Sequence, residues 1–507
     1  MNHCTTLPEL LSLGNDDQLA IGAPDQLDVT FKSLRLFITH TVAQLNSFGI
    51  GRNDRVAIVL DNGPEMALAF MSIASGATSA PLNAGYRADE FEFYLEDLKA
   101  KAIVVKAGSE SPAIAVAHKL GVAIIDLHPS SECGAGTFTL SLRSKKKMVL
   151  KQGGWAKADD IALILHTSGT TSRPKIVPLS QSNVCASAGN IANTLAFTAK
   201  DRGLNIMPLF HIHGLIAGVL APLSAGAYVS CTPGFNALKF FSWMDQVKPT
   251  WYTAVPTMHQ TILTRANNNQ VIIQNNPLRF IRSSSSSMPV KVIEELEACF
   301  KAPLIESYGM TEASHQMCSN LLPPGLRKPG TVGVAAGPRV AIMDEQGKLL
   351  GIGETGEIVI QGANVTKGYE NNPKANAENF TQGWFRTGDQ GTIDADGYVT
   401  ITGRLKEIIN RGGEKISPRE VDEILMEHPA VLQVVTFAIP HEKLGEEVGA
   451  IVVLREGKSA DEKDIRSFAA QKLADFKVPK KIIFMDEIPK GATGKLQRIG
   501  LATKLGL

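Results

Sequence analysis

The sequence predicts an α/β protein. We expect a large N-terminal domain of doubly wound β/α subdomains with a small β-rich subdomain, and then a small, mobile α+β domain. The chain has 507 residues, more than one hydrophobic core usually supports. Short apolar runs alternate with amphipathic stretches as far as about Phe300, the order typical of a parallel sheet covered by helices. From about Val332, short strands separated by glycine turns predict the β-rich subdomain.

The N-terminal stretch shows the alternation most clearly. After Thr30, a plausible helix N-cap, apolar residues recur at helical spacing. The apolar run RVAIVL ends at Asp-Asn-Gly, as a buried strand and turn would. In chain order we expect a strand over 55–60, a helix from Pro64 to about Ser75, a helix over 89–100 and a strand over 101–106.

The same alternation continues in IALILHTSG, in LNIMPLF and in LRFIRSSSSSMPVKVIEELEACF. The five serines 283–287 could form a flexible linker, but they stand between an apolar strand (278–282) and a helical run (Val290–Phe300). A strand-to-helix turn at the carboxyl edge of a parallel sheet is where such folds bind ligands, so we favour a site. Beyond Gly403 the chain is charged and mixed, with a helix expected in PREVDEILMEHP. We therefore place domains at 1–403 and 404–507.

Composition excludes several classes of protein. The formal net charge of +1 gives no electrostatic reason to expect nucleic acid or an anionic membrane as a partner. The six cysteines are scattered, without a C-x-x-C pair, which argues against a disulfide scaffold or a thiolate zinc site. The N-terminus lacks a signal-peptide pattern, no apolar run is long enough to span a bilayer, and the final KLGL is not a peroxisomal address. We expect a cytoplasmic protein.

The stretch HTSGTTSRPK (166–175) suggests a phosphate-binding loop of an unusual kind. Backbone N–H groups and hydroxyls can surround a polyphosphate, and Lys175 can neutralise it. A P-loop would carry a second glycine directly before the lysine, whereas Pro174 stands there. Because proline fixes φ and removes a donor, this loop need not lead into a helix. Taken alone, a Ser/Thr-rich surface loop remains an alternative.

Three further segments carry charged candidates. ESYGMTEASH follows a short strand expected over APLI (302–305), and in it Glu312 is a plausible Mg²⁺ ligand and Thr311 a phosphate donor. In WFRTGD, we expect Asp389 after a tight turn, where its carboxylate could accept both ribose hydroxyls. Lys495, in PKGATGKLQR, lies on a glycine-flanked loop suited to a moving domain. In isolation, a glutamate such as Glu312 is more often a solvated surface residue, and Asp389 could equally be an ordinary turn residue.

Taken in this order, the segments resemble the adenylate-forming superfamily of acyl-CoA synthetases, peptide-synthetase adenylation domains and luciferases. The resemblance spans residues 167–498 and rests on seven segments: TSGTTSRPK, PLFHIHG, ESYGMTEA, GETGEIVIQG, WFRTGD, GRLKEIINRGGEKISP and PKGATGKLQR. APLNAGYRADEFEFYL, TWYTAVPTMHQ, FIRSSSSS, NVTKGY and INRGGEKISP look like the subgroup that activates oxalate. One such motif is weak, but seven in the correct order leave little room for chance.

The resemblance implies two half-reactions, with Mg²⁺ as cofactor and ATP and coenzyme A as co-substrates. A small carboxylate attacks the α-phosphate of ATP and releases pyrophosphate, and the thiol of coenzyme A then displaces AMP. Because the first step joins two anions, catalysis should come from cations and oriented donors rather than from a protein nucleophile.

The resemblance also implies roles for individual residues. The catalytic set would be Lys495, Thr311, Glu312 and Lys175, with Glu312 as the metal ligand. The residues expected to bind ATP or AMP are Thr167, Ser168, Gly169, Thr170, Thr171 and Lys175 at the phosphates, Thr311 at the α-phosphate, Asp389 and Arg404 at the ribose, and Ser285, Ser286, Glu306, Ser307 and Tyr308 beside adenine. Lys406 matches the hinge about which the small domain would rotate, and Gly412 and Gly413 would let the pantetheine arm pass close to backbone.

The substrate is harder to predict. A dicarboxylate needs a compact polar pocket, because its second carboxylate must be paired once it is desolvated. The candidates are His211, His213, Ser284, Ser285 and His315. Arg282 is a weaker one, since it is expected to point away from the site. A ligase for malonate or a small monocarboxylate, an ATP phosphotransferase or ATPase, and a non-catalytic nucleotide-binding paralogue remain alternatives. We expect a monomer or weak homodimer.

Overall fold

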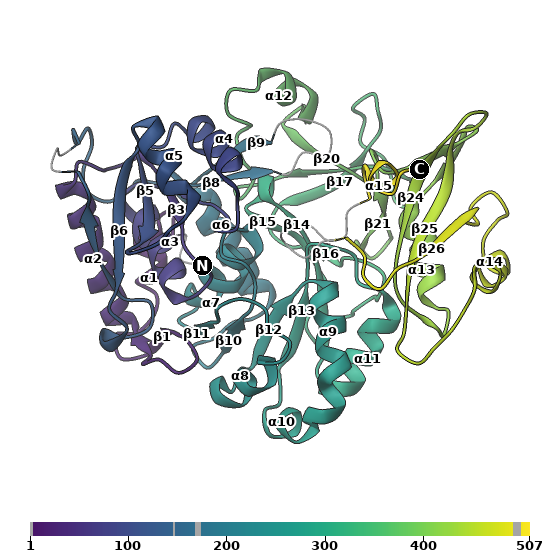
Figure 1. The fold of residues 1–507 in the computed structure, drawn as a ribbon, viewed down its shortest axis with the longest axis horizontal. Helices are drawn as coiled ribbons and strands as arrows, with labels where there is room; N and C mark the ends of the chain where they lie inside the picture. The colour runs from purple at the N-terminus through teal and green to yellow at the C-terminus, as the bar shows by residue number, and fades with distance from the viewer. Residues whose placement is uncertain (1–3, 145–147, 168–173, 490–497) are drawn as a thin grey trace.

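A computed structural model describes residues 4–144, 148–167, 174–489 and 498–507. The strands form four sheets; in Figure 1 the N-terminal sheet lies at one end of the molecule, a C-terminal lobe at the other, and the remaining two sheets between them. The first two sheets carry helices on both faces, the third is antiparallel, and the fourth belongs to a mixed α+β unit. The predicted fold class is confirmed.

The first sheet has seven strands in the order β7-β6-β5-β3-β4-β8-β9. Apolar residues of α2 and α3 pack on one face, and those of α4 and α5 on the other, which makes the sheet doubly wound. The elements are α2 (Phe31–Ser47), β3 (Arg55–Val59), α3 (Pro64–Gly76), β4 (Thr78–Pro81), α4 (Ala88–Leu98), β5 (Ala102–Lys106), α5 (Pro112–Leu120), β6 (Ala123–Pro129), η1 (Ser131–Cys133), β7 (Phe138–Leu142), β8 (Ile161–Thr167) and β9 (Lys175–Ser180). The predicted strands and helices all occur, and Thr30 caps α2 by accepting from the Ser33 N–H.

The second sheet has nine strands in the order β16-β15-β14-β13-β12-β10-β11-β1-β2. Its six central strands are parallel. Its elements are α1 (Leu7–Leu11), β1 (Leu19–Gly22), β2 (Val29–Thr30), α6 (Gln181–Thr194), β10 (Arg202–Asn205), the π-helix η2 (His213–Leu220), α7 (Ala221–Leu223), β11 (Tyr228–Cys231), α8 (Phe240–Val247), β12 (Trp251–Ala254), α9 (Pro256–Ala266), η3 (Asn267–Asn269), α10 (Gln270–Asn275), β13 (Phe280–Ser283), α11 (Val290–Phe300), β14 (Leu304–Met310), η4 (Thr311–Ala313), β15 (His315–Ser319) and β16 (Val334–Ala335).

Helix α3 joins these two sheets into one body. It contacts β3 and β8 of the first sheet and β11 of the second, and every residue of the helix except Glu65 is buried. A helix that is apolar all round can be stable only when it is covered on all sides. Burial of α3 between the sheets therefore fixes how their carboxyl edges lie relative to each other.

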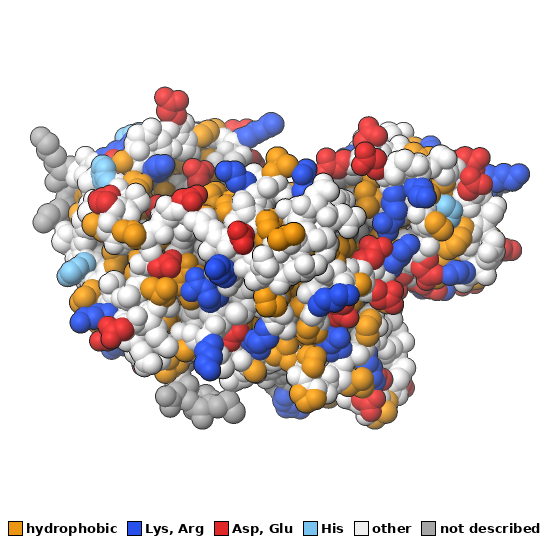
Figure 2. All heavy atoms as spheres, turned by 90° about the horizontal axis from the view of Figure 1, so that it is seen from below, with side chains coloured by type: hydrophobic (Ala, Val, Ile, Leu, Met, Phe, Trp, Pro, Cys, Tyr) orange, Lys and Arg blue, Asp and Glu red, His pale blue; other side chains and the backbone are white. Residues whose placement is uncertain are grey.

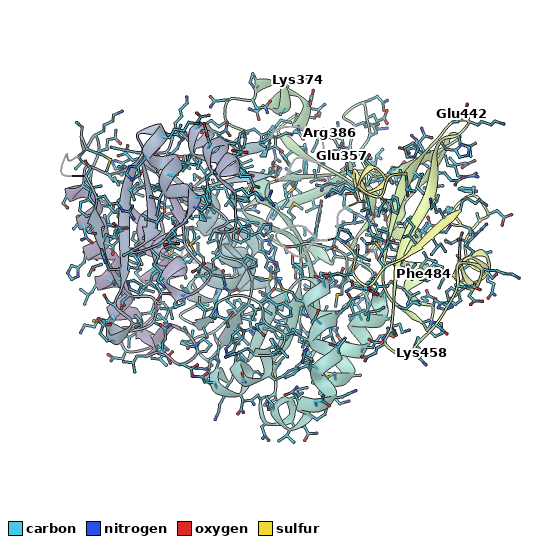
Figure 3. The ribbon with its side chains drawn as sticks, viewed as in Figure 1. Glu357, Lys374, Arg386, Glu442, Lys458 and Phe484 are labelled. Carbon is cyan, nitrogen blue, oxygen red and sulfur yellow. The ribbon has the colours of Figure 1, made fainter. Side chains whose placement is uncertain are left out.

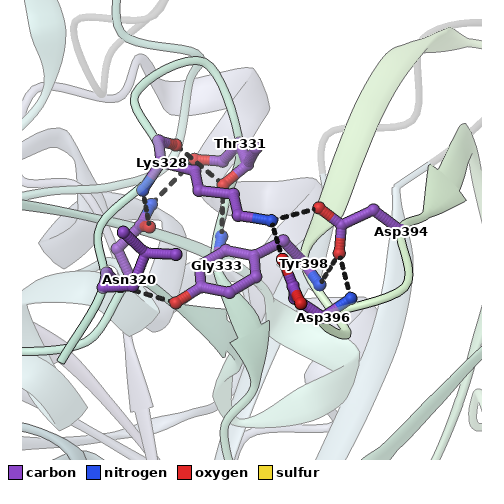
Figure 4. A network of polar contacts seen from close by, with 8 residues as sticks. Asn320, Lys328, Thr331, Gly333, Asp394, Asp396 and Tyr398 are labelled. Atoms are coloured by element: carbon purple, nitrogen blue, oxygen red, sulfur yellow. Dashed lines mark hydrogen bonds and ion pairs between the residues drawn. The ribbon is translucent and has the colours of Figure 1, made fainter.

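The β-rich subdomain is an antiparallel sheet of β17 (Arg339–Met343), β18 (Gly356–Gln361), β19 (Phe380–Thr381), β20 (Trp384–Ile393) and β21 (Val399–Arg404), with α12 (Pro373–Asn379) beside it. Across β18 and β20, Arg386 Nε donates to Glu357 Oε2 at 2.6 Å (Figure 3). The β20–β21 turn is tied to the nine-stranded sheet by Lys328, whose ammonium bonds Asp394 and Asp396 (Figure 4). These contacts hold the subdomain against the larger sheets.

The C-terminal elements form a lobe at one end of the molecule (Figures 1 and 2). They are β22 (Ile409–Arg411), β23 (Glu414–Ile416), α13 (Pro418–Met426), β24 (Val431–His441), β25 (Gly445–Leu454), α14 (Glu462–Ala470), β26 (Lys481–Phe484) and α15 (Leu501–Lys504). Strand β21 ends at Arg404, beside the predicted boundary between 403 and 404, which remains a prediction. Acidic and basic side chains are interspersed over the face in Figure 2. Within the described ranges, no helix is long and apolar enough to cross a membrane.

Three local predictions were wrong. The strand expected to end near Ile305 continues to Met310, because β15 pairs with its second half in antiparallel fashion. Asp389 does not follow a tight turn, but lies inside the ten-residue strand β20. The strand expected over LNIMPLF ends at Asn205. Strand pairing uses backbone groups, so polar residues can continue a strand whose apolar run has ended.

Candidate active site

A cleft of about 750 Å³ opens where the carboxyl ends of β8, β12 and β13 meet, and α13 and Arg498 of the C-terminal part close one side. Ligands bind at this edge in open α/β sheets. The structure brings many of the predicted site residues to its wall: Thr167, His211, Ser285, Ser286, Ser307, Tyr308, Thr311, Glu312, His315, Asp389 and Arg404. Residues separated by more than two hundred positions in the sequence thus share one cavity.

The predicted phosphate loop joins two antiparallel strands. β8 ends at Thr167 and β9 begins at Lys175, and these two residues are opposite each other in the ladder. The loop therefore leads into a strand rather than a helix, as Pro174 indicated. Ser168, Gly169, Thr170 and Thr171 lie outside the described residues, so their predicted role remains a prediction.

The Lys175 ammonium is partly buried and lies in the field of a second cation, Lys406, and of two carboxylates, Glu312 and Glu378. It sits 4.4 Å from the centre of the Tyr369 ring. Burial lowers the pKa of Lys175, and the charge of Lys406 lowers it further. Two cations in each other's field repel, and a bound polyanion would relieve that repulsion. This arrangement suits the triphosphate of a nucleotide.

Glu312 is the buried carboxylate of the site. It is only 5% exposed, and its Oε1 accepts a hydrogen bond of 2.7 Å from the Tyr369 hydroxyl. Burial raises the pKa of Glu312, so the ionised carboxylate is under-solvated. Magnesium in nucleotide sites takes one or two carboxylates plus phosphate oxygens, and Glu312 fits that pattern. Among the described residues, no cluster of three or more His, Cys, Asp or Glu could hold a metal by itself.

The two residues predicted to bind ribose face each other across β20 and β21. Arg404 Nε lies 3.3 Å from Asp389 Oδ1, and the Tyr308 hydroxyl donates to Asp389 Oδ2. The Asp389 carboxylate is thereby oriented at the cleft wall. Glu306 does not line the cleft: it is buried behind it, its Oε1 accepts from the Met288 N–H, and burial raises its pKa to about 7.

The residues predicted for the acyl pocket separate into two groups. His211, Ser285 and His315 line the cleft. His213 lies directly behind, with Nδ1 3.1 Å from Ser285 Oγ and its ring stacked on His315 at 4.8 Å between centres. Ser284 is fully buried, and its hydroxyl donates to the Ser307 carbonyl at 3.1 Å, so it does not reach the wall.

Arg282 lies outside the cleft wall, as expected, but it is not remote from the site. It is fully buried, and its NH1 lies 3.3 Å from His213 Nε2. The sequence reasoning missed this contact. Tyr369 was also missed, although its segment NVTKGY contributes to the resemblance, because nothing in the sequence indicates that Tyr369 would contact Glu312.

The predicted hinge is surrounded by charged partners. Just after Lys406, Glu407 lies 3.3 Å from Arg498, whose guanidinium also pairs with the buried Asp422 at 2.7 Å. These ion pairs link the turn after β21 to α13 and to the chain that follows the predicted Lys495 loop. Lys495 itself lies outside the described residues.

The predicted coenzyme A loop is a β-hairpin turn. Gly412 and Gly413 connect β22 to β23 with φ values of +61° and +100°. Two consecutive positive φ values strongly favour glycine. Neither glycine is among the residues that line the cleft. Their geometry explains why the turn needs glycine, and their role toward coenzyme A remains a prediction.

Comparison with known proteins defines the class to which this fold and site belong. Residues 14–370 match the AMP-binding enzyme family and residues 420–495 match the AMP-binding enzyme C-terminal domain, so the chain belongs to the family of AMP-binding enzymes.

Individual relatives cover nearly the whole chain. It is 44% identical to an oxalate–CoA ligase of Arabidopsis thaliana over 489 residues, covering 95% of this chain and 94% of that protein. It is 41% identical to an oxalate–CoA ligase of Saccharomyces cerevisiae, covering 95% and 94%. The crystal structure of ATP-bound MatB from Rhodopseudomonas palustris is 29% identical and superimposes with a TM-score of 0.87, covering 99% and 98%.

Proposed function

We propose that the protein is an AMP-forming acid–CoA ligase that converts oxalate, ATP and coenzyme A into oxalyl-CoA, AMP and pyrophosphate. Membership of the AMP-binding enzymes supports the adenylating chemistry. The named relatives, both oxalate–CoA ligases, support the substrate. The observation that carries the choice is that three polar side chains, His211, Ser285 and His315, line the cleft, where they could pair with a second carboxylate.

In the first half-reaction the cations and donors would bring two anions together. Lys175 and the loop before it would bind the β- and γ-phosphates, Thr311 would donate to the α-phosphate, and Asp389 would accept from the ribose hydroxyls. Lys495 would reach the attacking carboxylate and the α-phosphate. Such preorganised donors lower the barrier because the charge they stabilise grows as the transition state forms.

The metal would be held by Glu312 together with phosphate oxygens of ATP. Bound there, Mg²⁺ would neutralise charge on the phosphates. The Tyr369 hydroxyl orients the Glu312 carboxylate, and the Lys175 ammonium on the face of the Tyr369 ring adds a second positive charge nearby. A bound Mg²⁺ would thus compensate the negative charge of the Glu312 carboxylate, which is costly to bury without a partner.

In the second half-reaction, the C-terminal part would rotate about Lys406 and bring the Gly412–Gly413 turn toward the acyl-adenylate. The two domains would then be 1–403 and 404–507. The small carboxylate, ATP and coenzyme A would be the only partners of a cytoplasmic monomer or weak homodimer.

A ligase for another short acid is the second candidate. MatB has a similar fold at only 29% identity, so the fold alone does not determine which acid is used. The deciding experiment is ATP–pyrophosphate exchange with oxalate, malonate and acetate. Oxalate should support the highest kcat/KM. Exchange with malonate or acetate but not with oxalate would overturn the substrate assignment.

The reaction class has its own test. Under turnover with coenzyme A, the nucleotide product should be AMP, released together with pyrophosphate. ADP and inorganic phosphate as products would identify a phosphotransferase or ATPase instead, and would refute the adenylating mechanism.

A further inference from the structure

Arg282, on β13, is a buried cation without a carboxylate partner among the described residues. Its side chain is fully buried. Among the described residues, its terminal nitrogens meet His213 Nε2 and Thr253 Oγ1 at 3.3 and 3.5 Å from NH1, and Gln316 Oε1 at 3.3 Å from NH2. Its Nε makes no hydrogen bond to any residue that the structure describes. Guanidinium groups are almost never fully buried unless they are paired. This one therefore needs an explanation.

The neutral partners of Arg282 are themselves held in place. Gln316 donates through Nε2 to Thr194 Oγ1 and to the Ala336 carbonyl, so its amide oxygen is left facing the guanidinium. Burial lowers the pKa of Arg282 to about 9, and the group therefore still carries its charge at neutral pH. The positive charge is fixed in position behind the wall of the cleft.

The contact with His213 determines which ring nitrogen of this histidine carries a proton. A guanidinium can only donate, so the Nε2 atom that faces Arg282 must be unprotonated. The Thr253 hydroxyl, 2.7 Å from the same nitrogen, must then donate as well. His213 is consequently neutral, with its proton on Nδ1.

The proton on Nδ1 in turn orients Ser285. Nδ1 lies 3.1 Å from Ser285 Oγ and donates to it, so the serine hydroxyl is free to donate in another direction. Ser285 lines the cleft and has a φ of +74°, a left-handed conformation that non-glycine residues rarely adopt. A chain of oriented groups thus runs from the buried cation to a hydroxyl donor at the wall.

We propose that Arg282 is a positioning residue for the second carboxylate of the substrate: it holds His213 as the Nδ1–H tautomer, so that the Ser285 hydroxyl points into the cleft as a donor, and its charge attracts the carboxylate bound there. The proposal rests on the proposed function, because an acid with one carboxylate would leave this charge uncompensated. On this proposal, Arg282 strengthens binding of the non-reacting carboxylate of a dicarboxylate and does not affect binding of ATP.

The magnitude follows from the distances. Two contacts of 3.3 and 3.1 Å and the width of one imidazole separate the guanidinium from Ser285 Oγ. A carboxylate bound by the Ser285 hydroxyl lies one further hydrogen bond away, so about 11 Å separates it from the charge. At an effective dielectric constant of about 20, a unit charge at about that distance changes its binding roughly 10-fold. Loss of Arg282 should therefore raise the KM for oxalate by about that factor.

The test compares Arg282→Met, which removes the charge at similar length, with Arg282→Lys, which keeps it. Arg279→Met is the matched control, since Arg279 precedes the same strand and pairs with Asp201 outside the cleft. In ATP–pyrophosphate exchange, Arg282→Met should raise the KM for oxalate about 10-fold and leave the KM for ATP unchanged. Arg282→Lys should recover part of the loss, and the control should match the wild type.

Three results would overturn the proposal. An oxalate KM in Arg282→Met within about threefold of wild type would do so, as would an equal rise in the KM for ATP, or no recovery by lysine. If the wild-type protein itself does not use oxalate, the proposed function fails and this inference falls with it. If the wild type uses oxalate and the variant is unaffected, only the inference fails.

A measurement on the wild-type protein covers the case in which Arg282→Met does not fold. Among the described residues, the groups that contact the His213 ring include Arg282 on β13, Thr253 on β12, His315 on β15 and Ser285 after β13. Nitrogen-15 NMR of the labelled histidines, assigned with His213→Gln, should show a neutral ring protonated on Nδ1 from about pH 6 to 8. An Nε2–H tautomer or an imidazolium would refute the proposal.

Discussion

Removing the Tyr369 hydroxyl should make the metal site depend more strongly on pH. In Tyr369→Phe the ring remains, and with it the contact with the Lys175 ammonium at 4.4 Å. Only the 2.7 Å hydrogen bond to Glu312 Oε1 is lost. A hydrogen bond to a charged group contributes roughly 1.5–3 kcal/mol, equivalent to about 10- to 100-fold in binding.

The direction of the pH effect follows from the pKa of Glu312. Burial raises this pKa, and the Tyr369 hydrogen bond is the largest cause that lowers it. Without the hydroxyl the pKa rises further, and protons compete more strongly with Mg²⁺ for the carboxylate. The apparent KM for Mg²⁺ should therefore rise about 10-fold or more near pH 6.5, and should approach the wild-type value at high pH.

The assay is ATP–pyrophosphate exchange across Mg²⁺ concentrations from about pH 6.5 to 9. Tyr398→Phe is the matched control, because it removes a phenol hydroxyl that bonds the Leu326 carbonyl away from the cleft (Figure 4). Superimposable pH profiles for Tyr369→Phe and wild type, with unchanged Mg²⁺ dependence, would refute the assignment of Glu312 as the metal ligand.

Three further predictions concern other parts of the chain. Lys495→Ala should abolish adenylation but spare thioester formation from supplied acyl-adenylate, as single-turnover assays would reveal; equal loss in both steps would contradict the assigned role. Lys406→Pro, which fixes φ at the predicted hinge and restricts the residue before it, should impair thioester formation more than adenylation, and comparable defects would argue against a hinge. Burial raises the pKa of Glu306 to about 7, so its contribution to stability is present at low pH and is lost as pH rises from about 4.5 to 7. The free energy of unfolding of Glu306→Gln minus that of wild type should therefore be up to about 3 kcal/mol larger at pH 8 than at pH 4. The measurement is the free energy of unfolding of both proteins at the two pH values. The same difference at both would show that the carboxylate is not under-solvated.

Several parts of the fold could be predicted because their causes are local. The alternation of apolar and amphipathic segments predicted β3, α3, α4 and β5 to within a few residues, since each element's pattern lies in its own sequence. Pro174 indicated that the predicted phosphate loop need not lead into a helix, and strand β9 follows it. Strand ends were less predictable, because β14 and β20 are extended by partners elsewhere in the chain.

The sequence by itself predicted which side chains form the site: a lysine and hydroxyls proposed for phosphate, a glutamate proposed for the metal, and an aspartate proposed for ribose. Their order along the chain was enough to place the protein among adenylate-forming enzymes. Only the tertiary structure decided which groups touch. It brought Tyr369 to Glu312, turned Ser284 away from the cleft and placed a buried Arg282 behind His213. Hydrogen-bond direction and desolvation depend on neighbours that are distant in sequence, and these neighbours exist only once the sheets have packed.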